Sequence, residues 1–381
     1  MLAVDPVRDR QRSDIDSHAR PARCCLDTAE LTDAYASVDI PPEVVSRFAF
    51  RANDYYTSLI DADDPDDPIR RLVVPSDEEL VDFGSLDASN EAANTPFVGV
   101  QHKYADTALL LVTDQCACFC RYCFRKRLFQ PGSRETHRDC RPGLEYIASH
   151  AEITDVLLTG GDPLTLDTAF LRETVKQILA IPHVRTIRLG SKLPAFNPYR
   201  VLDDPELPQM VGDVVASGRS FYVMAHFDHP RELTEEAVAA LASLRAAGAM
   251  CVNQCPITCG INDDAEVLAD LFQLCTDAGC PQYYAFQCRP TTGVGHFALP
   301  MVSAFRHVEK AREQVSGLSR RVRFCLSHES GKIEIVGIDE AHIYARYHRA
   351  KLVEDAGRFI VYRRDDEAFW VDQLEEVSHD S

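Results

Sequence analysis

Short apolar runs, each ending in polar or glycine residues, recur along the chain from about residue 102. Amphipathic stretches of helical length separate them, for example TEEAVAALASLRAAG and DAEVLADLFQLCTDAG. Continuous apolar strands that alternate with helices indicate a parallel sheet covered by helices. The pattern therefore predicts an α/β protein, an incomplete (β/α)6 barrel, with strands at ALLLVT (108–113), DVLLTGGD (155–162), TIRLGS (186–191), FYVMAHF (221–227), MCVNQCPI (250–257) and YYAFQC (283–288).

The segments on either side of these repeats have a different composition. Residues 1–25 mix arginine with aspartate and are expected to form a flexible tail. Residues 26–101 carry short helical patterns and acidic turns such as DADDPDDP, which predict an N-terminal helical extension. The core barrel is expected over residues 102–317, and residues 318–381 are expected to form a C-terminal lid.

Polar and glycine residues gather where the predicted strands end. They occur in TDQC, TGGD, GSK, HFDH, NQ and QCR. In β/α barrels the catalytic groups lie at the C-terminal ends of the strands. A site built from these motifs is therefore predicted at that edge of the sheet.

The composition narrows the class of protein. No run of 18 apolar residues and no apolar N-terminal segment is present, so we expect a cytoplasmic protein that does not span a membrane. Cytosolic thiols stay reduced, so the 14 cysteines favour metal binding or catalysis over disulfides. The net charge of −19 opposes binding to nucleic acid or anionic lipid and favours a small-molecule substrate.

The segment CACFCRYCFRKR places Cys116, Cys120 and Cys123 in the spacing C-x3-C-x2-C. A disulfide knot, a zinc site and an iron–sulfur cluster are the three interpretations. Structural zinc usually takes four ligands in two separated pairs, and no second C-x2-C pair follows. Three thiolates in one loop can hold three irons of a four-iron cluster and leave the fourth iron open. Cys118 is expected to be an ordinary thiol.

This cysteine spacing on a β/α barrel resembles the radical S-adenosylmethionine (radical SAM) superfamily. Six segments over about residues 100–335 are similar, in the same order, to the lysine 2,3-aminomutase family. They are LLLVTDQCACFCRYCFRKR, DVLLTGGDPL, IRLGSKLPAFNPYR, AHFDHPRELTEE, NQCPITCGINDD and YYAFQCRPTTGVGHF. The resemblance implies an isomerase that moves an amino group between carbons 2 and 3 of an amino acid.

The resemblance also implies three cofactors. A 4Fe-4S cluster would bind SAM and cleave it to a 5′-deoxyadenosyl radical, which abstracts hydrogen from the substrate. Pyridoxal 5′-phosphate would be held as a Schiff base to a lysine, and Lys332 in HESGKIEIVG stands at about the right distance. The glycine-rich run expected before this lysine is shortened here to Gly331.

Other site residues follow from the same resemblance. Arg125 would grip the substrate carboxylate, because its planar fork pairs with both oxygens. Lys103 and Thr107 fall where the family has arginines of the phosphate site. The SAM pocket would be lined by Gly160, Gly161, Asp162, Ser191, His226 and Gln254.

Two departures from the family pattern concern the substrate. Arg289 stands where the family's lysine enzyme has an aspartate that receives the far ammonium of lysine, and a second acidic partner falls at Cys325. Lysine is therefore disfavoured, and a substrate with an acidic or neutral far end, glutamate for example, is expected. The C-terminal cysteines that bind structural zinc in the family are absent, so no zinc is expected.

Two alternatives remain at this stage. The chain could be a radical SAM enzyme of the same fold that deaminates, dehydrates or epimerises, or a non-enzymatic zinc protein. The expected partners are an amino acid, an electron donor such as flavodoxin or ferredoxin, and a second copy of the chain in a homo-oligomer.

Overall fold

The computed structural model describes residues 40–130, 132–136 and 139–377. The predicted tail over residues 1–25 and the first part of the predicted extension lie outside these residues. The described part of the extension contains short helices and turns, α2 (Pro42–Arg47), α3 (Asp54–Thr57), α4 (Pro68–Val73), η1 (Asp77–Leu80) and η2 (Ala92–Asn94). The division of the chain into four segments stays a prediction.

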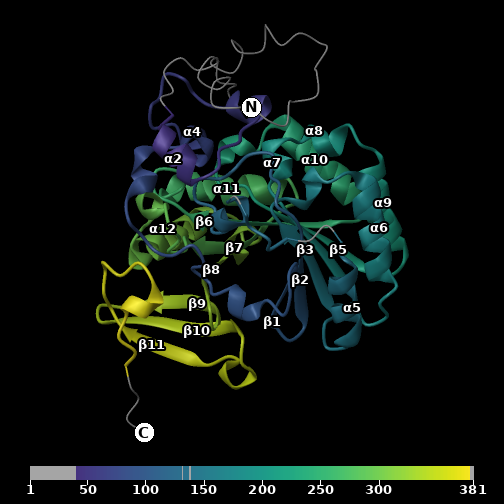
Figure 1. The fold of residues 1–381 in the computed structure, drawn as a ribbon. Helices are drawn as coiled ribbons and strands as arrows, with labels where there is room; N and C mark the ends of the chain where they lie inside the picture. The colour runs from purple at the N-terminus through teal and green to yellow at the C-terminus, as the bar shows by residue number, and fades with distance from the viewer. Residues whose placement is uncertain (1–39, 131, 137–138, 378–381) are drawn as a thin grey trace.

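One sheet of eleven strands, paired in the order of the sequence, runs through the described chain (Figure 1). Its central strands are all parallel, and their order is β2 (Thr107–Thr113), β3 (Asp155–Gly160), β4 (Thr186–Ser191), β5 (Ser220–Ala225), β6 (Met250–Ile257), β7 (Gln282–Gln287) and β8 (Arg323–His328). The α/β class is therefore confirmed, and each predicted strand contains or overlaps one of β2–β7.

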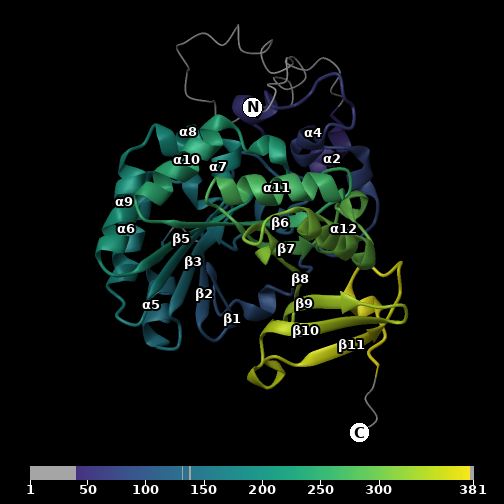
Figure 2. The same ribbon diagram turned by 180° about the vertical axis from the view of Figure 1, so that it is seen from behind.

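Antiparallel strands extend the sheet at both of its ends. β1 (Val100–Tyr104) pairs with β2, and the C-terminal side adds β9 (Gly331–Ile338), β10 (His342–Ala350) and β11 (Phe359–Arg363). Both views place β9–β11 below α12 and apart from the other helices (Figures 1 and 2). The C-terminal segment thus continues the main sheet through the pairing of β7 with β8.

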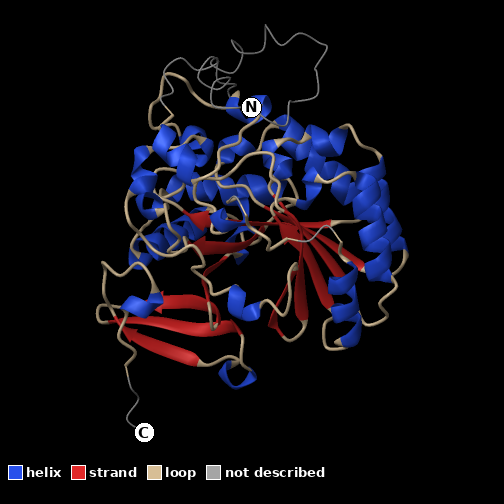
Figure 3. Cartoon of the chain, in the orientation of Figure 1, coloured by secondary structure: helices blue, strands red, loops and turns tan. Residues whose placement is uncertain are grey.

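Helices connect the parallel strands and lie on the outer side of the sheet (Figure 3). They are α5 (Arg141–Ser149), α6 (Thr168–Leu179), α7 (Leu193–Phe196), α8 (Tyr199–Leu202), α9 (Glu206–Ala216), α10 (Glu235–Ala246), α11 (Ala265–Asp277) and α12 (Met301–Gln314). No helix in the described ranges has the length and apolar character needed to cross a membrane.

Side-chain caps fix where the longer helices begin. The carboxylate of Asp167 accepts a hydrogen bond from the backbone N–H of Phe170 at 2.7 Å at the start of α6. Thr234 and Asp264 cap α10 and α11 in the same way. Such caps satisfy backbone donors that the helix itself leaves free. Because each cap ends a loop that follows a strand, the lengths of these loops at the C-terminal edge of the sheet are fixed locally by sequence.

Candidate active site

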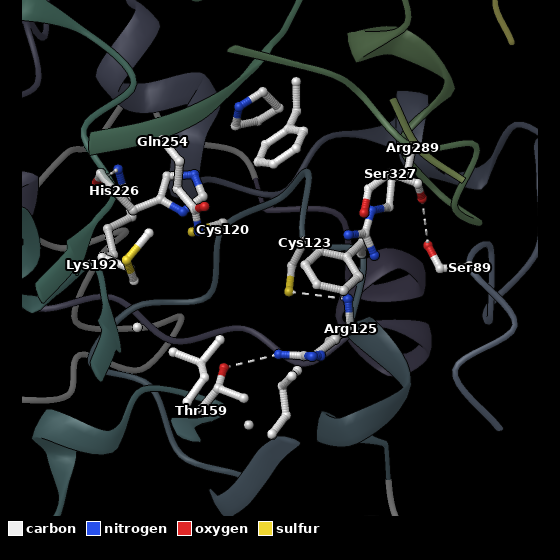
Figure 4. A pocket seen from close by; sticks show the side chains of 18 of the residues that line it. Ser89, Cys120, Cys123, Arg125, Thr159, Lys192, His226, Gln254, Arg289 and Ser327 are labelled. Carbon is white, nitrogen blue, oxygen red and sulfur yellow. Dashed lines mark hydrogen bonds between the residues drawn. The ribbon is translucent and has the colours of Figure 1, made fainter. Parts of the chain in front are cut away.

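A cavity of about 340 Å³ opens at the C-terminal edge of the parallel strands. Every residue that the sequence analysis assigned to binding or catalysis lines it, namely Lys103, Cys116, Cys120, Cys123, Arg125, Gly160, Gly161, Asp162, Ser191, His226, Gln254, Arg289 and Lys332. Figure 4 shows part of this lining from close by, and Cys120, Cys123 and His226 are among the residues that it labels. The fold thus brings together motifs spread over more than 200 residues, whose individual roles stay predictions.

The cysteine loop follows β2 directly. Cys116, Cys120 and Cys123 line the cavity, and so does the buried Cys118. Burial raises the pKa of Cys116 well above its ordinary value, and nearby Asp162 and Cys123 raise it further. Burial likewise raises the pKa of Cys120. Thiolates in this place need a positively charged partner, which a bound metal supplies.

A buried ion network joins the cysteine loop to the N-terminal extension. Arg121 donates to both carboxylate oxygens of Glu79, each at 2.8 Å, and Lys126 Nζ donates to Glu79 Oε2 at 2.8 Å. Burial by itself would raise the pKa of Glu79, but Arg121 and Lys126 hold it below its ordinary value. One carboxylate in η1 therefore pairs with two cations that flank Cys123 in the sequence.

Replacing Glu79 by Ala should destabilise the protein strongly. The change leaves Arg121 and Lys126 buried without their carboxylate, and breaking a buried pair costs about 3–5 kcal/mol. Urea unfolding of the two proteins would measure the difference in free energy of unfolding. Glu43→Ala, which removes an exposed glutamate of α2, is the matched control. A loss no greater than in the control would show that the network does not stabilise the fold.

A second buried network of charged and hydrogen-bonded groups, centred on Asp228, also holds the cysteine loop. The hydroxyl of Tyr122, between Cys120 and Cys123, donates to Asp228 Oδ2, and Lys192 Nζ donates to the same oxygen at 2.8 Å. His226 Nε2 lies 3.3 Å from Asp228 Oδ1. Despite its burial, the pKa of Asp228 is held well below its ordinary value by Lys192 and His226. This network ties the cysteine loop to the ends of β4 and β5.

Two glycines at the end of β3 allow the chain to pass close to the cysteine loop. Gly160 has φ +120°, and a Cβ there would lie 2.3 Å from the carbonyl oxygen of Thr113. A Cβ on Gly161 would lie 2.3 Å from the carbonyl oxygen of Gln115. Only glycine fits such backbone contacts. The turn is thus built for close packing against the residue before Cys116.

The side chains of Asp162 and Ser191 form a hydrogen bond with each other in the wall of the cavity. Asp162 Oδ2 accepts from Ser191 Oγ at 2.9 Å and from the backbone N–H of Lys192 at 2.8 Å. Its other oxygen accepts from the backbone N–H of Leu164 at 3.0 Å. The side chain of Asp162 therefore joins the ends of β3 and β4. Because both of its carboxylate oxygens already accept hydrogen bonds from the protein, its main effect is to hold the glycine turn in place.

Arg125 is already paired with a carboxylate that the sequence analysis missed. Its Nη2 lies 3.0 Å from Glu91 Oε1, and its Nη1 donates to Thr159 Oγ1 at 3.0 Å (Figure 4). Burial alone would raise the pKa of Glu91, but Arg125 and Arg127 hold it well below its ordinary value. Any substrate carboxylate at Arg125 would share its guanidinium with Glu91.

Arg289 lies just beyond β7 and points into the cavity (Figure 4). Its guanidinium carbon lies 3.7 Å from the centre of the Phe124 ring. Its Nη1 is buried and has no hydrogen-bond partner among the described residues. Burial lowers the pKa of Arg289 to about 10, against the pull of Glu91. A buried donor without a partner is costly, so this end of the cavity favours an anionic ligand.

Lys332, the second residue of β9, reaches an aromatic part of the cavity. Its Nζ lies 4.9 Å from the ring centre of Tyr284 and 5.0 Å from that of Phe286. Burial, together with the charge of Arg289, lowers the pKa of Lys332 to about 8. The preceding Gly331 is required, because a Cβ there would lie 2.4 Å from the carbonyl oxygen of Arg349.

Comparisons with known proteins decide the family. The chain is 51% identical over 336 residues to a protein of Aquifex aeolicus named "Putative L-lysine 2,3-aminomutase", covering 88% of this chain and 90% of that protein. It is 30% identical over 310 residues to the L-lysine 2,3-aminomutase of Methanococcus maripaludis, covering 80% and 69%. The chain belongs to the lysine 2,3-aminomutase family. The glutamate 2,3-aminomutase of Clostridioides difficile is 33% identical over 279 residues, covering 73% and 65%. No protein-family model matches the chain.

Membership in the lysine 2,3-aminomutase family makes the protein an enzyme of the isomerase class, which excludes the non-enzymatic alternative. Enzymes of this family use a 4Fe-4S cluster, SAM and pyridoxal 5′-phosphate. Lys332 fits the last of these, because a desolvated lysine with a lowered pKa attacks a carbonyl readily.

The cysteine loop also fits its cofactor. In the described part of the chain, no three histidine, cysteine, aspartate or glutamate side chains are grouped closely enough to hold a single metal ion. Cys116, Cys120 and Cys123 nevertheless line one cavity. Their spacing, C-x3-C-x2-C in one loop, suits a cluster in which each thiolate binds a different iron.

Proposed function

We propose that this aminomutase moves the 2-amino group to carbon 3 of an amino acid whose side chain ends in an acidic or neutral group. The observation that carries this proposal is the buried guanidinium of Arg289, whose Nη1 lacks a partner and which shares the cavity with Lys332. The glutamate 2,3-aminomutase among the relatives shows that the family is not confined to lysine. We further propose that β2–β7 serve as the incomplete (β/α)6 barrel expected from the sequence.

The cofactors that the cavity would hold have different roles in the reaction. When bound, the cluster and SAM supply a radical that abstracts hydrogen, and pyridoxal phosphate supplies the carbonyl that takes the substrate amine. We propose that Cys116, Cys120 and Cys123 bind the cluster and that Lys332 holds pyridoxal phosphate through its carbonyl group. Gly160, Gly161, Asp162, Ser191, His226 and Gln254 form the wall proposed for SAM. The electron donor, cytoplasmic location and homo-oligomer stay predictions.

The charges around Lys332 support an acidic side chain on the substrate. Arg289 and Lys103 line the same cavity, and the carboxylate of Glu91 is paired with Arg125 and Arg127. The far ammonium of lysine would lose its water and meet cations, which is unfavourable in a desolvated pocket. A carboxylate would form a charge-assisted pair with Arg289, which is a strong hydrogen bond. The expected preference therefore follows from the charges that line the cavity.

We expect glutamate to support more 5′-deoxyadenosine and β-amino acid formation than lysine. Arg289→Gln should lower kcat/KM for the acidic substrate about 10- to 100-fold, because a hydrogen bond between charged groups contributes roughly 1.5–3 kcal/mol. Anaerobic assays with SAM and a reductant, read by chromatography of both products, would measure this. Arg306→Gln, an exposed arginine of α12, is the control. Lysine turnover by the wild type at the rate of the best amino acid tested would end this proposal.

A further inference from the structure

Arg349 of β10 reaches the wall of the cavity formed by β1 and β2. Its Nη2 donates to Thr107 Oγ1 at 2.6 Å and pairs with Asp106. Its guanidinium carbon lies 4.2 Å from the centre of the Tyr104 ring. The arginine lines the cavity with its side chain 28% exposed. The guanidinium therefore bridges the C-terminal strands and the first strands of the sheet.

The register of the C-terminal strands places Arg349 beside the proposed cofactor lysine. In the pairing of β9 with β10, Arg349 is the partner of Lys332. Directly paired residues of neighbouring strands project from the same face of the sheet. A ligand held by Lys332 would therefore have Arg349 as its cross-strand neighbour.

Lys103 of β1 adds a second cation on this side. Its Nζ lies 5.5 Å from the centre of the same Tyr104 ring and donates to the carbonyl oxygen of His328. Burial, together with the charges of Arg289 and Lys332, lowers the pKa of Lys103 to about 7. Lys103, Arg289 and Lys332 repel one another when charged, so an anion bound among them would stabilise their charged forms.

The carboxylates nearby do not remove this excess of positive charge. Glu91 is paired with Arg125 and Arg127. Asp106, the partner of Arg349, has a side chain that is 63% exposed, and water screens such a pair. The wall near Lys332 is thus suited to a ligand group with more than one negative charge.

We propose that Arg349, together with Lys103, binds the phosphate group of the pyridoxal phosphate held by Lys332. The proposal rests on the proposed function, because it takes Lys332 as the attachment point. A phosphate monoester is a dianion that accepts hydrogen bonds from the planar fork of arginine. Position 107, where an arginine was implied by resemblance, is a threonine here, and the guanidinium of Arg349 lies against its hydroxyl. A guanidinium thus lies beside position 107, but it belongs to Arg349 of β10 and not to residue 107 itself.

Two probes that differ only in the phosphate test the proposal. Pyridoxal 5′-phosphate and pyridoxal would be titrated into the full-length protein with its cluster reconstituted, with absorbance giving each dissociation constant. The wild type should bind the phosphorylated probe more tightly. Arg349→Gln should weaken that binding about 10- to 100-fold, the loss for one hydrogen bond to a charged group, and change pyridoxal binding little. Adding Thr107→Arg to Arg349→Gln should restore part of the loss.

The controls separate this inference from the function on which it rests. Arg346→Gln, on the exposed face of β10, should leave both dissociation constants unchanged, and iron content should match the wild type in every variant. Unchanged binding of the phosphorylated probe by Arg349→Gln, or equal losses for both probes, would overturn the role of Arg349. Failure of the wild type to attach either probe at Lys332 would instead overturn the proposed function, and this inference with it.

Discussion

Replacing Cys116, Cys120 or Cys123 by Ala should reduce 5′-deoxyadenosine formation to below detection, whereas Cys118→Ala should retain it. The first three thiols lie at the spacing C-x3-C-x2-C and line the cavity. A cluster held by only two thiolates would lack a ligand on one further iron and would be lost or inactive. Anaerobic reconstitution with iron and sulfide, then incubation with SAM and a reductant, would measure both iron content and the nucleoside product.

Cys118 is the matched control because it belongs to the same loop and lines the same cavity, and it is more buried than the other three thiols. Its replacement tests whether the loss in the other variants comes from ligation or from damage to the loop. If only the Cys118→Ala variant lost its iron, Cys118 would be a cluster ligand and the proposed set of three thiols would be wrong. If any one of the other three variants kept both iron and activity, the assignment of that thiol would be wrong.

Replacing Lys332 by Ala should abolish β-amino acid formation and the absorbance of attached pyridoxal phosphate, while the iron content stays at the wild-type level. The cavity around Lys332 is aromatic, and burial lowers the pKa of its amine to about 8. Only the neutral amine attacks a carbonyl, so cofactor attachment should speed up as the pH rises through about 8 and then level off. Absorbance after addition of pyridoxal phosphate to cofactor-free protein would follow both effects.

Lys310→Ala provides the control for this experiment, since Lys310 is an exposed lysine of α12. Borohydride reduction followed by peptide mapping would identify the modified lysine directly. Unchanged cofactor content and absorbance in Lys332→Ala would contradict the assignment. An attachment rate that kept rising through pH 10 would show that the reacting amine is not shifted as the structure implies.

Features set by short stretches of sequence could be predicted well. The strands β2–β7 were predicted because continuous apolar runs and helical periodicity are local patterns. The polar residues that end several of these strands line the cavity, as expected, whereas the roles given to individual residues came from the family resemblance and stay predictions. Gly160 and Gly161 were expected from the resemblance to line the SAM pocket, and the structure shows that they also let the chain pass close to the carbonyl oxygens of Thr113 and Gln115.

Pairs of residues far apart in the sequence could not be predicted. Glu91 meets Arg125 only after η2 has packed beside the cavity, and Arg349 meets Thr107 across 242 positions through the register of β9 and β10. Nothing in the local pattern of a charged residue tells which strand its partner will come from. The sequence therefore predicted the kinds of groups in the site, but not which of their charges are already neutralised.

The order of these residues along the chain has a consequence for biosynthesis. The two carboxylates that hold the cysteine loop, Glu79 and Asp228, are both made before residue 230, whereas Lys332 and Arg349 are made more than one hundred residues later. At about 5–20 residues per second, that interval lasts at least roughly 5–20 s on the ribosome. The cysteine loop can therefore acquire all of its buried charge partners while the pyridoxal end of the cavity does not yet exist. If the cysteine loop holds the cluster and Lys332 holds pyridoxal phosphate, as proposed above, the iron site can assemble first and the vitamin B6 site is completed last.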